Sequence, residues 1–157
     1  KYFKGTKRRF QVKKKIGDIT FVDDYAHHPT EIDAVLKAAR YLNPKRLFVI
    51  FQPHRFSRVE NLHKDFARCF ESADELVVTD IFAASEPNPK KIDAKSLSKE
   101  IQDNFKGCVT HIPKEKLINE IPLRLKDGDL VLGLGAGDIN NVMDGIINEL
   151  EASRIKT

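Results

Sequence analysis

Short apolar runs alternate with segments of helical periodicity along most of the chain. Runs of strand length, bounded by turn residues, lie at residues 19–22, 47–51, 75–80, 108–112 and 130–134. Each is followed by apolar residues at helical spacing, in segments 29–42, 57–72, 94–105, 114–125 and 139–150. Regular alternation of strand and helix is typical of a doubly wound, mostly parallel sheet, so we predict an α/β fold of this kind.

The first strand of the sheet is expected to differ from the rest. Residues 8–16 read as an edge strand, and the turn residues Gly17 and Asp18 join it directly to the strand at 19–22. Such a hairpin connection makes the pair antiparallel. We therefore expect a six-stranded sheet with one antiparallel edge strand and about five helices, the helix at 114–125 being cut or shifted near Pro122.

Composition places the chain among ordinary globular proteins. Its 157 residues are 41% hydrophobic and 32% charged, which fits a single domain. No signal peptide or membrane-length apolar run is present, so we expect a cytoplasmic protein without a membrane partner. Cys69 and Cys108 lack metal-type spacing and are predicted to be small core residues. The chain starts at Lys1 instead of methionine, from which we expect a fragment of a longer protein.

The net charge of +4 is a weak indication of anionic ligands. Lysines and arginines concentrate in residues 4–15, which a nucleic-acid-binding protein would also show. Val12 and Ile16 are apolar near this stretch, and no aromatic stacking platform follows. A solvated strand face is therefore favoured and no nucleic-acid partner is expected, although a basic nucleic-acid-binding domain stays open as an alternative.

The turn at residues 23–28 is the richest in polar chemistry. Carboxylates, a phenol and imidazoles occupy most of its positions, namely Asp23, Asp24, Tyr25, His27 and His28. In an open α/β sheet, ligands bind outside the carboxyl ends of the strands, beside exposed helix N–H groups. We therefore predict a ligand site here, with an ordinary solvated polar turn as the alternative.

The turn at residues 52–58 adds two guanidiniums. Arg55 and Arg58 lie three positions apart at a helix entry, where both can face one side of the first turn. Paired arginines bind a carboxylate or phosphate through bidentate hydrogen bonds, so we predict an anion site. The alternative is an ordinary surface ion pair of Arg58 with Glu60 or another acid.

A third turn, at residues 133–138, is rich in glycine. Its GxGxG spacing lacks the third glycine of a dinucleotide fingerprint and lies in the last strand–helix unit. Nucleotide binding is only weakly indicated, and tight packing of strand and helix explains the glycines about as well. Because parallel strands end at the same edge of a sheet, we expect the three turns to gather at a common rim.

Four ordered motifs that span nearly the whole chain resemble the C-terminal domain of the Mur ligases. They are FKGTKRRF at residues 3–10, DDYAHHPTEI at 23–32, QPHRFSR at 52–58 and GAGDI at 135–139. Within the family, the resemblance is strongest to members that add L-alanine to UDP-N-acetylmuramate. Members that attach a murein tripeptide instead share the HHPT core and are the alternative.

The resemblance implies a Rossmann-like third domain of an enzyme whose N-terminal UDP-sugar and central ATPase domains lie outside these residues. The implied reaction is ATP-dependent ligation, in which the muramoyl carboxylate becomes an acyl phosphate that the amine of L-alanine attacks. ATP and Mg²⁺ are the implied cofactors of the full-length enzyme. No GxxxxGK[ST] phosphate loop occurs in the sequence, so we expect the chain alone to be inactive and to bind no cofactor tightly. A non-catalytic nucleotide- or amino-acid-binding module is a further alternative.

Carried over residue by residue, the resemblance places Tyr25 and His27 at the amino-acid pocket. It gives Arg55 and Arg58 the carboxylate of L-alanine, and Asp24 the ribose hydroxyls of ATP. A small amino acid offers little apolar surface, so a charge clamp at its carboxylate and orientation of its amine must supply recognition.

Three further residues of these motifs have two open roles each. His28 either joins the site or orients the loop. His54 could serve the amino acid or the nucleotide. Asp138 either meets the substrate amine or caps the last helix, the cap being slightly favoured.

Overall fold

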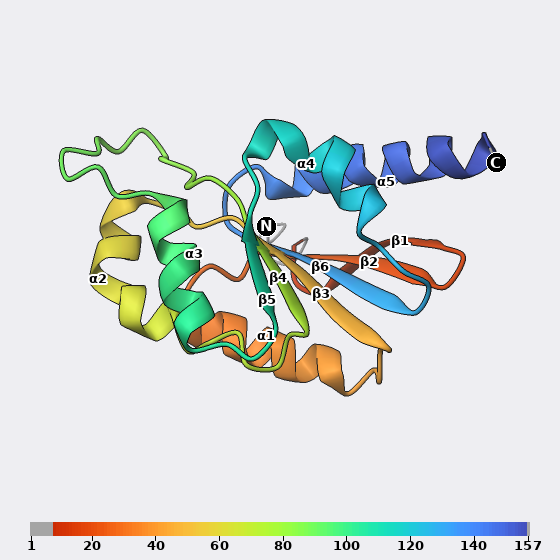
Figure 1. Cartoon of the computed structure of the whole chain (residues 1–157), viewed down its shortest axis with the longest axis horizontal. Helices are drawn as coiled ribbons and strands as arrows, with labels where there is room; N and C mark the ends of the chain where they lie inside the picture. Colours follow the sequence, from red (N-terminus) through yellow and green to blue (C-terminus); the bar gives the residue numbers. More distant parts are fainter. Residues whose placement is uncertain (1–7, 157) are drawn as a thin grey trace, which may run out of the picture.

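A six-stranded sheet divides the molecule into two helical layers (Figure 1). The structure is a computed structural model that describes residues 8–156. Its strands are β1 (Gln11–Ile16), β2 (Ile19–Asp24), β3 (Arg46–Phe51), β4 (Glu75–Val78), β5 (Cys108–His111) and β6 (Asp129–Leu134). They lie in the order β1-β2-β6-β3-β4-β5, with β1 antiparallel to β2 and the other neighbours parallel. The predicted α/β fold with one antiparallel edge strand is confirmed.

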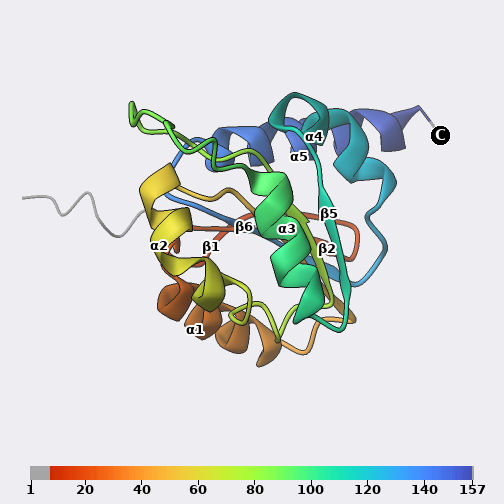
Figure 2. The same cartoon turned by 60° about the vertical axis from the view of Figure 1, so that its left-hand side comes forward.

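Each face of the sheet carries its own helices and its own apolar core. Helices α1 (Pro29–Arg40), α2 (Phe56–Phe66) and α3 (Ala94–Asp103) cover one face, and α4 (Lys114–Glu120) and α5 (Ile139–Ile155) cover the other (Figures 1 and 2). Successive strand residues point to opposite faces. Val49 and Phe51 of β3 therefore belong to the first core, while Phe48 and Ile50 belong to the second.

The last strand in the sequence lies in the middle of the sheet, between β2 and β3. The helices that follow β2 and β3 cover one face, whereas α5, which follows β6, covers the opposite face. Where neighbouring strands send their chains to opposite sides, a crevice opens outside their carboxyl ends. The three polar turns of the sequence follow β2, β3 and β6, at this edge of the sheet.

Several boundaries differ from the sequence-based expectations. β1 begins at Gln11 instead of residue 8, and α2 ends at Phe66, where turns take over up to residue 72. The helix expected to be interrupted near Pro122 ends at Glu120 and continues as a short 3-10 helix. Cys69 is buried as predicted, but the prediction for Cys108 is wrong, because it lies exposed at the start of the edge strand β5.

The amino-terminal features extend beyond the described residues. Residues 3–7 of the first family motif, and the lysines of the basic stretch at positions 4 and 7, lie outside the described range. Within the range, Lys13 and Lys14 of β1 form ion pairs with Asp144 and Glu151 of α5. No helix between residues 8 and 156 is both long and apolar enough to cross a membrane.

Candidate functional site

Side chains from the turns after β2 and β3 form a continuous row at the carboxyl edge of the sheet. The rings of Tyr25 and His27 lie edge to face with their centroids 5.1 Å apart. The His27 ring lies 5.7 Å from that of His54, whose Nδ1 is 3.0 Å from Nη1 of Arg58. The structure therefore brings together four of the residues that the sequence analysis selected, from two separate turns.

Asp24 closes the end of β2 and is almost fully buried. Its Oδ2 accepts a hydrogen bond from the N–H of Phe10 at 2.7 Å, and its Oδ1 accepts one from the N–H of Ala26 at 2.8 Å. These bonds give the carboxylate a structural role in shaping the turn. Asp24 also lines a cavity of about 230 Å³, together with Arg9, Tyr25, Ala26, Glu31, Ala34 and Val35.

His28 begins helix α1 and has a structural role. Its Nδ1 accepts a hydrogen bond from the N–H of Thr30 at 3.2 Å, while Glu31 Oε1 accepts one from the N–H of His28 at 3.3 Å. These two bonds form a reciprocal capping box, which satisfies N–H groups that the helix itself cannot pair. Of the two roles left open for His28, the structure supports the one that orients the loop.

Arg8 ties two of the turns together, a role that the sequence analysis missed. Its Nε donates to Asp23 Oδ2 at 3.1 Å, and its Nη2 and Nη1 donate to the carbonyls of Gly135 and Gly137 at 2.9 and 3.2 Å. The guanidinium also lies 5.4 Å from the centre of the Tyr25 ring. Burial raises the pKa of Asp23, and the neighbouring Arg8 offsets this rise only in part.

Arg55 is the N-cap residue of α2 and has a strained backbone with φ at +70°. Its N–H donates to the carbonyl of Phe82 at 2.8 Å, which holds this conformation. The side chain is exposed, and the guanidinium makes no hydrogen bond or ion pair with any residue from 8 to 156. Within the described part of the chain, Arg55 therefore presents an unpaired cation.

Arg58 is half-buried and packs on His54. Its Nη1 donates to the carbonyl of His54 at 3.2 Å in addition to contacting the imidazole. The alternative of an ion pair of Arg58 with Glu60 or another acid is wrong for residues 8–156, where its guanidinium contacts His54 instead and Glu60 pairs with Nζ of Lys90 at 2.5 Å. Burial lowers the pKa of His54 and the positive charge of Arg58 lowers it further, so the imidazole is neutral at neutral pH.

The third turn is linked to the turn after β3 by Gln52, a buried residue that the sequence analysis did not select. Its Nε2 donates to Asp138 Oδ1 at 2.7 Å, and its Oε1 accepts the N–H of Ile139 at 3.1 Å. The slightly favoured role of Asp138 as a side-chain cap of α5 is wrong: Asp138 is the N-cap residue, but its carboxylate accepts no N–H of the helix and instead accepts bonds from Gln52 and Lys114.

Asp138 instead links the third turn to α4. Nζ of Lys114 lies 2.8 Å from Asp138 Oδ2. Burial raises the pKa of Asp138, but the hydrogen bonds from Gln52 and Lys114 outweigh it and lower the pKa below its usual value. The glycines of this turn serve packing, because a Cβ on Gly137 would lie 2.5 Å from the ring of Phe82.

The arrangement offers two arginines, a phenol and two imidazoles, and the guanidinium of Arg55 has no partner among residues 8–156. Such a set suits a small molecule that carries a carboxylate and has polar groups to be oriented. Within residues 8–156, no group of three or more His, Cys, Asp or Glu residues is placed to hold a metal ion.

Comparison with known proteins finds one family model and many relatives. The model of the Mur ligase, glutamate ligase domain, matches residues 8–137. A UDP-N-acetylmuramate–L-alanine ligase of Clostridium novyi is 45% identical over 140 residues, covering 89% of this chain and 31% of the relative. A ligase of the same name from Crocosphaera subtropica is 43% identical over 93% of this chain and 29% of its own length. The chain thus spans about a third of the length of these curated relatives.

A solved structure agrees with these sequence matches. The UDP-N-acetylmuramate–alanine ligase of Thermotoga maritima superposes with a TM-score of 0.76 at 27% identity, over 93% of this chain and 30% of that one. The sequence and the fold thus match the same class of relatives over nearly the whole chain.

Proposed function

Because the chain belongs to the Mur ligase family and carries its glutamate ligase domain, we propose that it is the C-terminal domain of a cytoplasmic ligase. The enzyme joins L-alanine to UDP-N-acetylmuramate with the use of ATP and Mg²⁺. Its UDP-sugar and ATPase parts belong to regions upstream of this chain. The two curated relatives described above carry the name of this activity, and the chain spans about a third of each of them.

Arg55 is the residue proposed to take the carboxylate of L-alanine, and its free guanidinium is the observation that carries the proposal. An exposed arginine without a partner among the described residues, held in a strained conformation, marks a position kept for a ligand. Arg58 supplies the second cation, three positions along the same helix. Tyr25 and His27 border the amino acid, and His54 orients Arg58.

The nucleotide is proposed to lie on the other side of Tyr25, against Asp24. Each oxygen of this carboxylate accepts one backbone N–H and can accept one more hydrogen bond, as from a ribose diol. The adjacent cavity of about 230 Å³ has apolar walls at Ala34 and Val35 and a cation at Arg9. Such a lining suits a nucleoside with attached phosphates.

In the proposed reaction, ATP phosphorylates the muramoyl carboxylate and releases ADP. The amine of L-alanine then attacks the acyl phosphate and forms the amide bond. Phosphate leaves, and a base takes up the proton that the amine loses. The residues of this chain act on the amino acid: they fix its carboxylate and leave the amine free to approach the acyl carbon. Phosphoryl transfer falls to the upstream region.

A ligation assay on the full-length protein tests this proposal. ATP and UDP-N-acetylmuramate are supplied with L-alanine, glycine, L-serine or the murein tripeptide, and product mass and phosphate release are measured. We expect L-alanine to give a kcat/KM at least about tenfold above the others, since binding of one methyl group differs by about that factor. Preference for the tripeptide, or no ligation with any acceptor, would contradict the proposal.

A further inference from the structure

Helix α2 begins without a cap from its own N-cap residue. An arginine side chain has only donors, so Arg55 cannot accept the N–H groups of the first turn. These N–H groups need an acceptor from elsewhere, because the first turn of a helix has no partner within the helix. The helix that carries both candidate arginines therefore depends on another segment for its start.

Glu86 supplies this acceptor from the loop that follows β4. Its Oε1 accepts the N–H of Ser57 at 2.7 Å, and its Oε2 accepts the hydroxyl of Ser57 at 3.0 Å. A negative charge at the N-terminal end of a helix also interacts favourably with the helix dipole. Ser57 lies two positions after Arg55, so these bonds fix the turn from which the Arg55 side chain extends.

The same loop also holds the backbone on the other side of Arg55. The N–H of Arg55 donates to the carbonyl of Phe82, and the N–H of Phe82 donates to the carbonyl of Pro53, each at 2.8 Å. The rings of Phe82 and His54 stack at 5.7 Å with 10° between their planes. Phe82 and Glu86 thus hold the chain before and after the strained residue.

Beyond Glu86, the loop also contacts α2 through the ion pair of Lys90 with Glu60. Figures 1 and 2 show it reaching past the N-terminal end of α2. A cavity of about 260 Å³ lies beneath it, bordered by Phe56 and Ser57 of α2 and by residues 86–90 of the loop. Glu60 lies about one turn further along α2, whereas Glu86 contacts the first turn itself, at Ser57.

We propose that Glu86 is a positioning residue for the amino-acid substrate, which it does not touch. Its carboxylate holds the first turn of α2 so that the guanidinium of Arg55 is preset for a substrate carboxylate. This inference rests on the proposed function and names a residue outside the row of site residues. It gives the loop after β4 a part in amino-acid binding.

Steady-state kinetics of the full-length protein test the inference with three variants. Glu86→Ala removes the acceptor, Glu86→Asp keeps the charge but shortens the reach, and Glu86→Gln keeps the reach without the charge. We expect Ala and Asp to raise the KM for L-alanine about tenfold, the upper end of what losing one hydrogen bond typically causes, with kcat and the KM for ATP within about twofold. Gln should restore most of the affinity.

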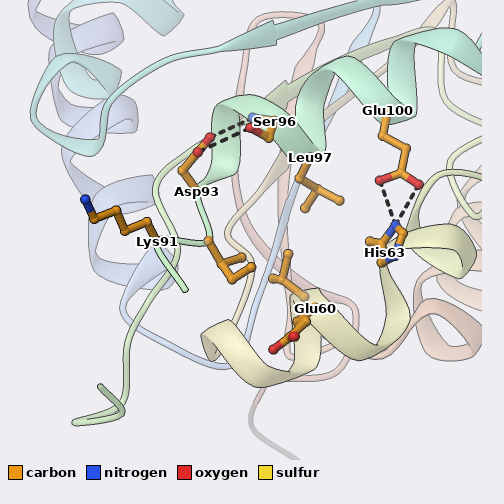
Figure 3. Close-up of a pocket in the computed structure, with 9 residues that line it drawn as sticks. Glu60, His63, Lys91, Asp93, Ser96, Leu97 and Glu100 are labelled. Carbon is orange, nitrogen blue, oxygen red and sulfur yellow. Dashed lines mark hydrogen bonds and ion pairs between the residues drawn. The ribbon is translucent and has the colours of Figure 1, made fainter. Parts of the chain in front are cut away.

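Glu100 of α3 offers a matched control, because it contacts the same helix α2 at another position. It reaches from α3 to His63 in the second half of α2, with Nδ1 2.7 Å from Oε1 and 2.8 Å from Oε2 (Figure 3). Glu100→Ala should therefore leave the KM for L-alanine unchanged. An equal rise in this control, an unchanged KM in Glu86→Ala, or equal KM values for the Ala and Gln variants would overturn the inference.

Two further measurements separate the possible failures. If the wild-type protein ligates no amino acid, the proposed function is wrong. If the wild-type protein ligates L-alanine and the Glu86 variants have the same KM, only this inference is wrong. If Glu86→Ala does not fold, the inference is tested by the rate of amide hydrogen exchange at Ser57 in Glu86→Gln and Glu86→Asp. Faster exchange of the Ser57 N–H in Asp than in Gln supports the inference, and equal exchange contradicts it.

Discussion

Arg46 begins strand β3 and Arg55 follows its end, and the two arginines have opposite surroundings. Nε and Nη2 of Arg46 donate to the two oxygens of Asp129 at 2.8 and 2.6 Å, and Nη1 donates to Glu75 at 2.7 Å. The guanidinium of Arg55, in contrast, has no hydrogen bond or ion pair with residues 8–156. Arg46 thus has two acidic partners, whereas Arg55 has none among residues 8–156.

The backbone around the two arginines differs in the same sense. Arg46 lies in regular strand geometry, paired with Asp129 of β6 in the sheet. Arg55 lies at φ +70°, in a conformation that neighbouring elements must hold in place. At the amino edge of the sheet, charge therefore joins strands to one another, whereas at the carboxyl edge it is presented outward. The contrast separates an arginine that links strands from one that is proposed to bind a ligand.

Replacing Arg46 should have the largest effect, and on stability alone. Arg46→Met leaves the buried carboxylate of Asp129 without its partner, which should lower the free energy of unfolding by about 3–5 kcal/mol. Lys37→Met, which breaks the exposed pair with Asp33, serves as the control and should change it by less than about 1 kcal/mol. Urea unfolding measures both, and equal losses would remove the contrast between the two edges.

Replacing Arg55 should affect binding instead of folding. Arg55→Ala should raise the KM for L-alanine about 30- to 1,000-fold, corresponding to about 2–4 kcal/mol, with little change in the KM for ATP. Arg55→Gly removes the same charge and relieves the strain at φ +70°, so it should also stabilise the domain by about 1 kcal/mol. Equal effects on the two KM values would refute the assignment to the carboxylate.

Replacing Asp24 should have the smallest effect, and it should affect both folding stability and ATP binding. Asp24→Asn replaces one acceptor oxygen by a donor, so one backbone N–H loses its partner and stability should fall by about 1–3 kcal/mol. ATP affinity of the full-length protein should fall as well, which calorimetry measures. Unchanged ATP affinity together with lower stability would leave Asp24 with its structural role alone.

The layered sheet could be predicted from the sequence because burial is encoded locally. The apolar runs of β3 and β6 and the helical spacing of α1 are visible within short windows. The end of α2 was missed because Cys69 and Phe70 continue the helical pattern although the chain there forms turns, which bury them equally well. The spacing of apolar residues thus predicts which residues are buried more reliably than it predicts which residues form helical hydrogen bonds.

The candidate site was predictable only in part. The polar turns and their shared edge follow from the alternation of strands and helices, and the structure brings His27 and His54 together. The residues that hold the turns act over long sequence separations: Arg8 reaches Gly135, and Glu86 reaches Ser57. No local pattern encodes such pairs. Glu31, three positions after His28, was a local signal of the capping box, masked because histidine is an unusual cap.

The central place of β6 has a consequence for how the domain is made. The strands that carry the tyrosine and arginine turns cannot reach their final spacing until a strand encoded near the end of the chain has inserted between them. During synthesis, the early half must therefore leave the ribosome with two unpaired strand edges. The row of candidate site residues can therefore assemble only after β6 has been synthesised and has paired with both neighbouring strands.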